Sequence, residues 1–350
     1  MESQLIVLLG GLLLLVACGG PAREVPAPIV TEVHFSETSA PPQATATPRP
    51  LALNVAELAY LDDARDLWLM EVGDNPARRK ITTQGNIRSF VWSPDGQILA
   101  YLVNGAVWLY DMQNGQPACL CHGLPDADLG LRLSWSPQQQ YLVLNRGTSM
   151  SQKLSMLEAA TGQIVKEINV ISGYAWGPDE SQLLIGQRHH LDEPIAVQPG
   201  DTVDLAVVSL DDPAAAPEIL LEGSAEVLYF PRDWLADGQI HYSRLDWNEA
   251  RQTGEQSYWA APWQDGELGV PEPLPDPYPR DSDTQLRQRL TERLPLQDDD
   301  LYWDWSPDHT QLVVAVGPPG KLYLLEGASS AAPRFLGAGL EPSWRPARAY

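Results

Sequence analysis

Several short runs of metal-binding or proton-transferring side chains stand out in this chain of 350 residues. His189 and His190 are followed by Asp192 and Glu193. Adjacent imidazoles and carboxylates can bind a metal ion or act as acid and base. This run lies in a polar loop bounded by prolines, where solvated side chains are the default. We therefore expect solvated residues there, with a catalytic or metal-binding role as the alternative.

Two other runs also contain possible metal ligands. Cys119 and Cys121 precede His122, and at this spacing the two thiols share one face of a strand. A zinc site would need a third and usually a fourth ligand from elsewhere, so we expect two thiols or a local disulfide. Asp298–Asp300 could hold Ca²⁺, but no calcium-loop pattern surrounds it. The sequence therefore predicts neither a metal site nor a cofactor.

The N-terminal residues carry a targeting signal. Leu5–Val16 is an apolar run of about twelve residues, shorter than the ~20 that span a bilayer but suited to a signal-peptide core. It ends at Leu15–Cys18, which resembles the bacterial lipobox. That resemblance implies cleavage after residue 17 and a diacylglycerol on the sulfur of Cys18, which anchors the chain to a membrane on its extracytoplasmic side. An ordinary secretory signal or a membrane helix is the alternative.

The rest of the chain divides into a tether and a domain. Residues 18–50 are rich in Pro, Ala and Thr and predict an extended tether. Residues 1–50 account for −2 of the net charge of −23, so the domain, residues 51–350, carries −21. Such an acidic domain argues against a nucleic-acid partner, because binding would release few counterions from the nucleic acid.

A repeat of about 40 residues organises the domain. Its clearest copy, Val91–Tyr101, contains the turn Trp-Ser-Pro-Asp-Gly between two apolar strands. Pro presets the backbone at the first turn position, and Asp-Gly supplies the positive φ that a tight hairpin needs. A period of about 40 residues with such turns is typical of propeller blades. The repeat carries its tryptophan at Trp92, Trp135, Trp176, Trp234, Trp305 and Trp344.

These turns resemble those of TolB-type β-propellers. The six tryptophan motifs predict an all-β fold, a six-bladed propeller of four-stranded blades. Glu57–Thr82 reads as a blade without its first strand, and Leu340–Pro346 as a first strand without a blade. We therefore expect the C-terminal strand to complete the N-terminal blade, which leaves no free edge. The resemblance does not specify function, since scaffolds, adaptors and enzymes share this architecture.

Three long insertions are expected on one side of the propeller, opposite the Trp-Ser-Pro-Asp-Gly turns. Two join second and third strands and one is a crossover between blades: Gln187–Thr202, Arg244–Gln256 and Asp276–Asp300. The third contains a predicted helix with leucines at i, i+4 and i+8. Arg287 lies on another face of this helix, either as an ordinary surface charge or as an anion ligand. Since loops on rigid scaffolds often carry function, the candidate ligand residues are Trp247, His189, His190 and Arg287. Trp247 is predicted to be exposed.

Two functions remain open on the sequence. The first is a lipid-anchored module of the bacterial cell envelope that binds or scaffolds a protein, peptide or glycan. The alternative is a propeller-fold enzyme acting on glycans, a lyase or hydrolase with its site at the channel mouth. No nucleophile-elbow motif and no carboxylate pair at a telling spacing occurs in the sequence, so we expect a binding module and not an enzyme.

Overall fold

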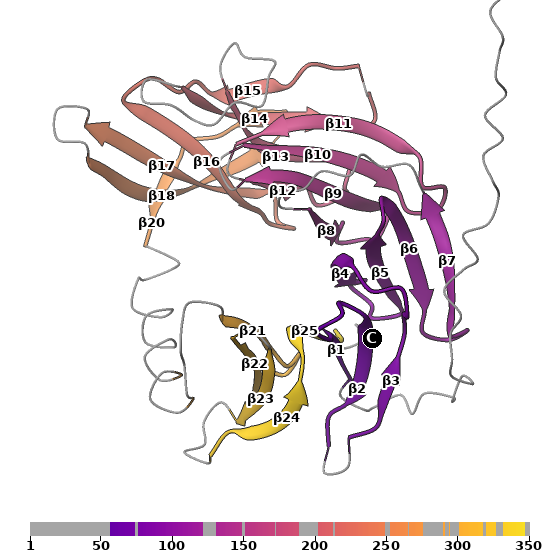
Figure 1. Cartoon of the computed structure of the whole chain (residues 1–350). Coiled ribbons are helices and arrows are strands. Elements are labelled where there is room, and N and C mark those ends of the chain that lie inside the picture. The colour runs from indigo at the N-terminus through magenta and orange to yellow at the C-terminus, as the bar shows by residue number, and fades with distance from the viewer. Residues whose placement is uncertain are drawn as a thin grey trace, which may run out of the picture. The chain divides into compact units, whose positions relative to one another are not determined.

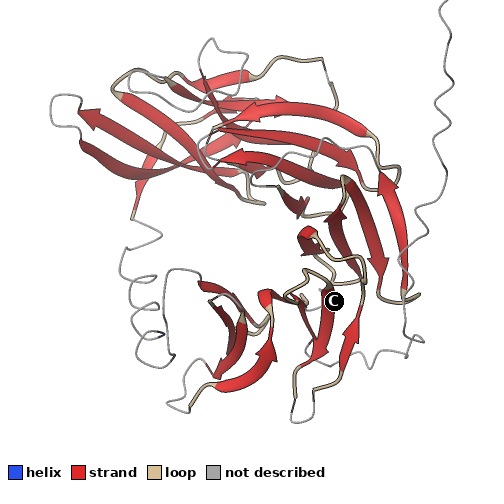
Figure 2. Ribbon diagram, viewed as in Figure 1, coloured by secondary structure: helices blue, strands red, loops and turns tan. Residues whose placement is uncertain are grey.

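This computed structural model describes residues 57–73, 76–121, 131–148, 151–171, 173–188, 202–212, 214–248, 253–264, 266–275, 290, 294, 301–317, 320–326 and 332–346. All of them belong to one compact unit, Ala40–Tyr350. Apart from the helical residue Leu290, every regular element in these residues is a β-strand (Figure 2). The signal segment and Cys18 lie outside the described residues.

The strands of the described residues form six antiparallel sheets (Figure 1). The first sheet contains β1 (Glu57–Leu61), β2 (Leu67–Glu71), β3 (Arg78–Lys80) and β25 (Leu340–Trp344). The second contains β4 (Ile87–Trp92), β5 (Ile98–Val103), β6 (Ala106–Asp111) and β7 (Gln116–Cys121). The third contains β8 (Arg132–Trp135), β9 (Tyr141–Thr148), β10 (Ser151–Glu158) and β11 (Ile164–Val170).

The remaining three sheets follow in chain order. The fourth contains β12 (Tyr174–Trp176), β13 (Gln182–Arg188), β14 (Val203–Ser209) and β15 (Glu218–Leu221). The fifth contains β16 (Val227–Trp234), β17 (Gln239–Asn248), β18 (Thr253–Gln264), β19 (Glu267–Leu268) and β20 (Glu272–Leu274). The sixth contains β21 (Leu301–Trp305), β22 (Gln311–Val316), β23 (Lys321–Glu326) and β24 (Arg334–Ala338).

This arrangement confirms the predicted all-β propeller and corrects one detail. Five of the sheets described have four strands, as expected. The fifth has a further strand, because β18 is long enough to pair with both β19 and β20 along one edge. The sequence concealed this because β19 is only two residues long and β20 contains Pro273, a residue typical of edge strands.

The C-terminal strand completes the first sheet, as predicted. β25 pairs antiparallel with β1, with Leu58 opposite Trp344 (Figure 1). The indole N–H of Trp344 donates to the Asp304 carbonyl oxygen of the sixth sheet at 3.2 Å. β25 therefore joins the two ends of the chain and also contacts the preceding sheet.

The residue after β25 extends this junction to the second sheet. The Arg345 guanidinium pairs with the carboxylate of buried Glu57 at 2.8 Å and donates to the Gly96 carbonyl oxygen at 2.7 Å. It also lies over the Trp92 ring, 5.6 Å from the centroid. Burial raises the pKa of Glu57, although the charges of Arg345 and Arg79 act in the opposite direction. Arg345 thus links the end of the chain to two sheets at once.

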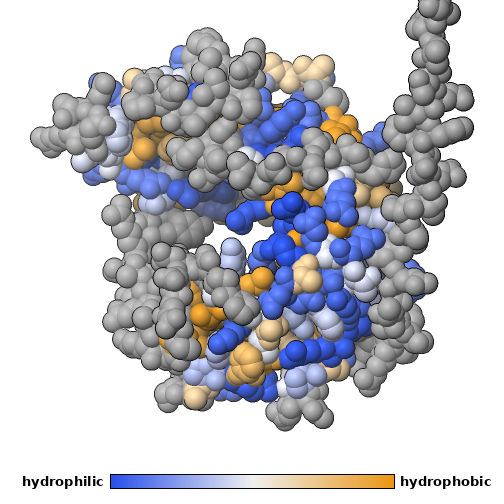
Figure 3. All heavy atoms as spheres, viewed as in Figure 1, coloured by the Kyte–Doolittle hydropathy of each residue, from blue (hydrophilic) through white to orange (hydrophobic). Residues whose placement is uncertain are grey.

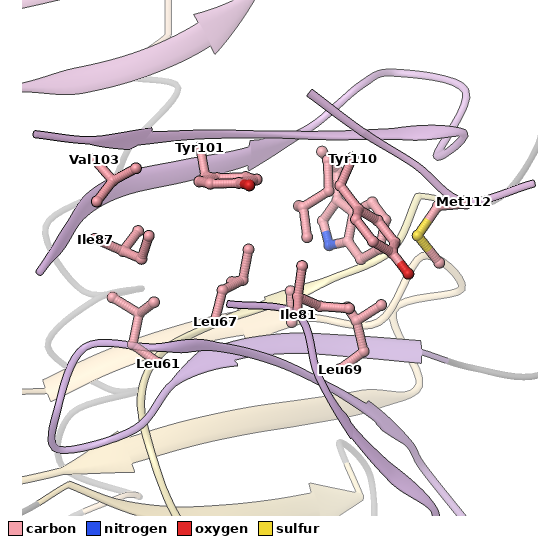
Figure 4. Close-up of a cluster of buried hydrophobic side chains, with 12 residues drawn as sticks. Leu61, Leu67, Leu69, Ile81, Ile87, Tyr101, Val103, Tyr110 and Met112 are labelled. Carbon is pink, nitrogen blue, oxygen red and sulfur yellow. The ribbon is translucent and has the colours of Figure 1, made fainter. Parts of the chain in front are cut away.

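Apolar clusters between successive sheets form most of the core. Figure 4 shows the cluster between the first and second sheets, where Leu67 and Leu69 face Tyr101 and Tyr110. Similar clusters join the second sheet to the third, the third to the fourth, the fourth to the fifth and the sixth to the first. The alternating apolar residues of each strand thus pack on both faces of the sheet.

The junction between the fifth and sixth sheets is built differently. None of the apolar clusters in the described residues joins these two sheets directly. Instead Leu290 and Leu294, which lie in the Asp276–Asp300 insertion, pack on Leu312 and Val314 of β22. Leu294 N–H donates to the Leu290 carbonyl oxygen at 2.8 Å, the i to i+4 bond of a helical turn. This agrees with the predicted helix, of which only these two residues are described.

The repeated turns have the predicted left-handed residue. In the first complete motif this is Gly96, with φ 66°. The corresponding non-glycine residues adopt the same conformation, with φ values of 66° at Gln139, 63° at Glu180 and 55° at His309. A serine directly after the strand stabilises the turn, since Ser93 Oγ donates to Asp95 at 2.7 Å and accepts from Ile98 N–H at 2.9 Å. The backbone conformation of the turn is therefore the same in the repeats where another residue stands in place of the glycine.

Candidate ligand site

A pocket of about 650 Å³ opens between the first strands of four sheets. First strands of neighbouring sheets lie close together, β4 beside β8 and β21 beside β25. β4, β8 and β21 contribute residues near the end where each strand begins, and β25 contributes its three middle residues. The described lining residues are Arg65, Arg88, Ser89, Phe90, Leu131, Arg132, Leu133, Tyr302, Trp303, Glu341, Pro342 and Ser343.

Strand alternation explains which side chains reach this pocket. In β4, Arg88 is exposed between buried Ile87 and Ser89, and in β8, Arg132 is exposed next to buried Leu133. In β21, Tyr302 is 47% exposed. Successive side chains of a strand point to opposite sides, so the apolar ones enter the packing between sheets and the others are left for solvent.

The pocket lies on the side of the propeller where the insertions were expected. The first strands begin at the pocket, and the Trp-Ser-Pro-Asp turns follow their other ends, as with Trp305 after Tyr302. Figure 3 shows a hollow in the viewed face with hydrophilic residues along part of its border. The long insertions leave from the same ends of their sheets, after β13 at Arg188 and before β21 at Leu301. The pocket and these strand ends therefore lie on the same side of the propeller.

Positive charge gathers in this pocket although the domain is strongly acidic. Arg65 is engaged, because it pairs with Glu341 at 3.0 Å and donates to the Ile87 carbonyl oxygen at 2.7 Å. Arg88 and Arg132 have no ion pair or side-chain hydrogen bond to any residue in the described part of the chain. Two guanidinium groups from different sheets therefore remain available to an anion.

Of the four candidate ligand residues predicted from the sequence, the structure describes only Trp247. His189, His190 and Arg287 lie outside the described residues, as does Asp298–Asp300. The sequence analysis did not select Arg88 or Arg132. A usable signal was present, since Arg132, Tyr302 and Glu341 each stand three residues before a repeat tryptophan. Arg88 stands four before Trp92 because the register of β4 shifts between Ile87 and Ser89.

Trp247 differs from its prediction. It is not an exposed loop residue: it lies in β17 opposite Gly254 of β18, half-buried against an apolar cluster that includes Val203 and Leu228. The segment Arg244–Gln256, expected to be a loop, largely continues the β17–β18 hairpin. The long β17–β18 strand pair extends the fifth sheet and places Trp247 against Val203 of the fourth sheet.

A smaller pocket of about 450 Å³ lies beside this hairpin and includes Trp247. Its main charged pair is internal, because Arg244 contacts Asp246 at 2.6 Å. Glu226 and Glu255 also line it. With its cation already paired, this pocket offers fewer free recognition groups than the one between the first strands.

Of the run Cys119–His122, the structure describes the two cysteines, and His122 lies outside the described residues. Cys119 and Cys121 are free, and burial raises the pKa of both thiols. In the part of the chain that the structure describes, no three His, Cys, Asp or Glu side chains come together as a possible metal site. The same residues contain no helix of the length and hydrophobicity needed to cross a membrane.

No protein-family model and no curated protein matches the chain. Among solved structures, TolB from Acinetobacter baumannii is similar with 15% identity over 85% of this chain and 68% of its own, at a TM-score of 0.40. The β-propeller domain of the Trilobed protease from Pyrococcus furiosus shows 11% identity over 82% and 86%, at a TM-score of 0.39. The fold is a β-propeller. These likenesses extend no further than the fold.

Proposed function

We propose that this propeller is a lipid-anchored binding module of a bacterial cell envelope, with its ligand in the pocket between β4, β8, β21 and β25. One observation carries the proposal: Arg88 and Arg132, from different sheets, are unpaired within the described residues and line the same 650 Å³ pocket. Pockets of 300–1,000 Å³ with a few convergent polar groups are typical of ligand sites.

The anchor is the second part of the proposal. The lipobox-like Leu15–Cys18 supports lipidation at Cys18, and the proline-rich segment 18–50 would hold the propeller away from the membrane. Cys18→Ala should abolish incorporation of labelled fatty acid and release the protein from membranes. Unchanged labelling in the variant would refute the anchor without affecting the pocket.

The enzyme alternative would require a reacting side chain in the pocket. Glu341 is the one carboxylate among the described lining residues, and Arg65 holds it at 3.0 Å. This pairing suits a structural role for Glu341 and leaves the free arginines for recognition. We therefore put forward binding of a protein, peptide or glycan ligand, without catalysis.

Photocrosslinking in cells tests the pocket directly. A photoreactive phenylalanine analogue would replace Tyr302, which lines the pocket and is 47% exposed. The matched control places the same analogue at Gln140, an exposed residue of the Trp135 turn on the opposite side. We expect adducts, detected by mass spectrometry, from position 302 and not from position 140. Equal adducts from both positions, or none from 302, would refute the proposal.

A further inference from the structure

The hydrogen-bonding groups of the strands around the pocket narrow the class of ligand. Peptides often bind sheets by adding a strand, which requires free backbone groups at a strand edge. Here several such groups are already occupied by side chains. Arg65 Nε donates to the Ile87 carbonyl oxygen at 2.7 Å, Trp92 Nε1 donates to that of Ser343 at 3.2 Å, and Leu133 N–H donates to Ser89 Oγ at 3.0 Å.

The same edge is also interrupted by a proline. Pro342, in the middle of β25, has no N–H to offer and lines the pocket. The backbone around the pocket is therefore a poor template for an added strand. Recognition has to come from the side chains that remain free.

Those side chains are of two kinds. Arg88 and Arg132 present planar guanidinium groups, which match the geometry of a carboxylate. Tyr302 is exposed and Phe90 also lines the pocket. An aromatic surface beside guanidinium groups suits a ligand that carries a carboxylate on a ring and also has an apolar ring face. Ser89 also lines the pocket, and its hydroxyl, which accepts a hydrogen bond from Leu133 N–H, still has a proton to donate to a hydroxyl group around such a ring.

We infer that the pocket binds uronic acid units of an acidic glycan, with Arg88 and Arg132 binding carboxylates and Tyr302 contacting a sugar ring. This inference rests on the proposed function, because it takes the pocket to be the ligand site. Because uronic acids recur along such chains, Arg88 and Arg132 need not bind the same carboxylate. The pocket volume of about 650 Å³ accommodates more than one ring.

Titration calorimetry with the full-length protein tests the ligand class. The probe is a tetrasaccharide that contains glucuronic acid, and its partner is the same tetrasaccharide with each carboxylate reduced to an alcohol. We expect the acidic form to bind and the reduced form to bind at least about tenfold more weakly, since each guanidinium–carboxylate hydrogen bond is a charge-assisted one. Equal affinity of the two forms would overturn the inference.

Variants then locate the site. Arg88→Gln and Arg132→Gln should each weaken binding by about tenfold or more. Arg334→Gln is the matched control, because Arg334 is an exposed arginine of the outer strand β24 and the change in charge is identical. Tyr302→Ala should weaken binding and Tyr302→Phe should restore it, since the phenylalanine keeps the ring. An equal loss in Arg334→Gln would show non-specific attraction and refute the site.

One further comparison separates the ligand class from the proposed function. A peptide that carries the same number of carboxylates is titrated alongside the tetrasaccharide. Tighter binding of the peptide would overturn the acidic-glycan inference and leave the pocket as a binding site. If neither probe binds but adducts at position 302 persist in cells, the ligand class is wrong and the pocket stands. If the adducts are also absent, the proposed function fails with it.

Discussion

Removing the Trp344 side chain should destabilise the whole propeller, not the first sheet alone. Trp344 is 4% exposed and packs in the cluster that joins the first and sixth sheets. Its backbone N–H donates to the Asp304 carboxylate at 2.7 Å, and its indole N–H donates to the Asp304 carbonyl oxygen at 3.2 Å. The backbone bond survives substitution, so the variants report on the indole.

Two substitutions separate packing from hydrogen bonding. Trp344→Ala should lower the free energy of unfolding by about 3–5 kcal/mol, the usual effect of truncating a buried aromatic residue. Trp344→Phe retains part of the ring but leaves the Asp304 carbonyl oxygen without its donor, which should cost about 1–3 kcal/mol. Because domains are stable by only about 5–15 kcal/mol, the alanine variant should lose a large part of the total.

Urea unfolding followed by circular dichroism and by tryptophan fluorescence measures these losses. Phe335→Ala is the control, because Phe335 is 58% exposed on β24 and should change stability by less than about 0.5 kcal/mol. Hydrogen exchange then shows where protection is lost. We expect faster exchange in all the sheets, since β25 connects both ends of the chain. A loss under 1 kcal/mol, or faster exchange confined to the first sheet, would refute this account of closure.

Three further predictions concern other parts of the propeller. Burial raises the pKa of Glu57 above 4.5 in the folded protein, so the folded state binds a proton more tightly than the unfolded chain does. The parent should therefore gain stability relative to Glu57→Gln as the pH falls from 7 towards 4.5. A pH-independent difference between their urea midpoints would contradict this. Leu290→Ala should cost about 2–5 kcal/mol because Leu290 is 1% exposed against β22. The exposed-site control Phe335→Ala should lose almost nothing in the same thermal unfolding measurement. His309→Gly should stabilise the protein by about 0.5–1 kcal/mol by relieving a φ of 55°. Gly96→Ala should destabilise it, because the new Cβ would lie 2.8 Å from the Pro346 carbonyl oxygen. Equal melting temperatures for both variants would show that the turn conformation has no such effect.

The architecture was determined by signals that are local in the sequence. The repeat around Trp92 combines a strand of alternating apolar residues with a turn whose residues favour one backbone conformation, and both preferences act within about ten residues. Closure was also predictable, because Glu57–Thr82 lacked a first strand and Leu340–Pro346 supplied one. Each half exposes unpaired backbone groups that only the other half can satisfy.

The site was decided by contacts between distant parts of the chain. Arg88 and Arg132 stand in separate repeats, and only the packing of β4 beside β8 brings them to one pocket. The burial of Trp247 depends on the cluster around Val203, and the junction between the fifth and sixth sheets depends on Leu290 and Leu294. Local periodicity predicts which face of a strand a side chain occupies. Which side chains meet across neighbouring sheets, and which charges stay unpaired, is decided only when the sheets pack together.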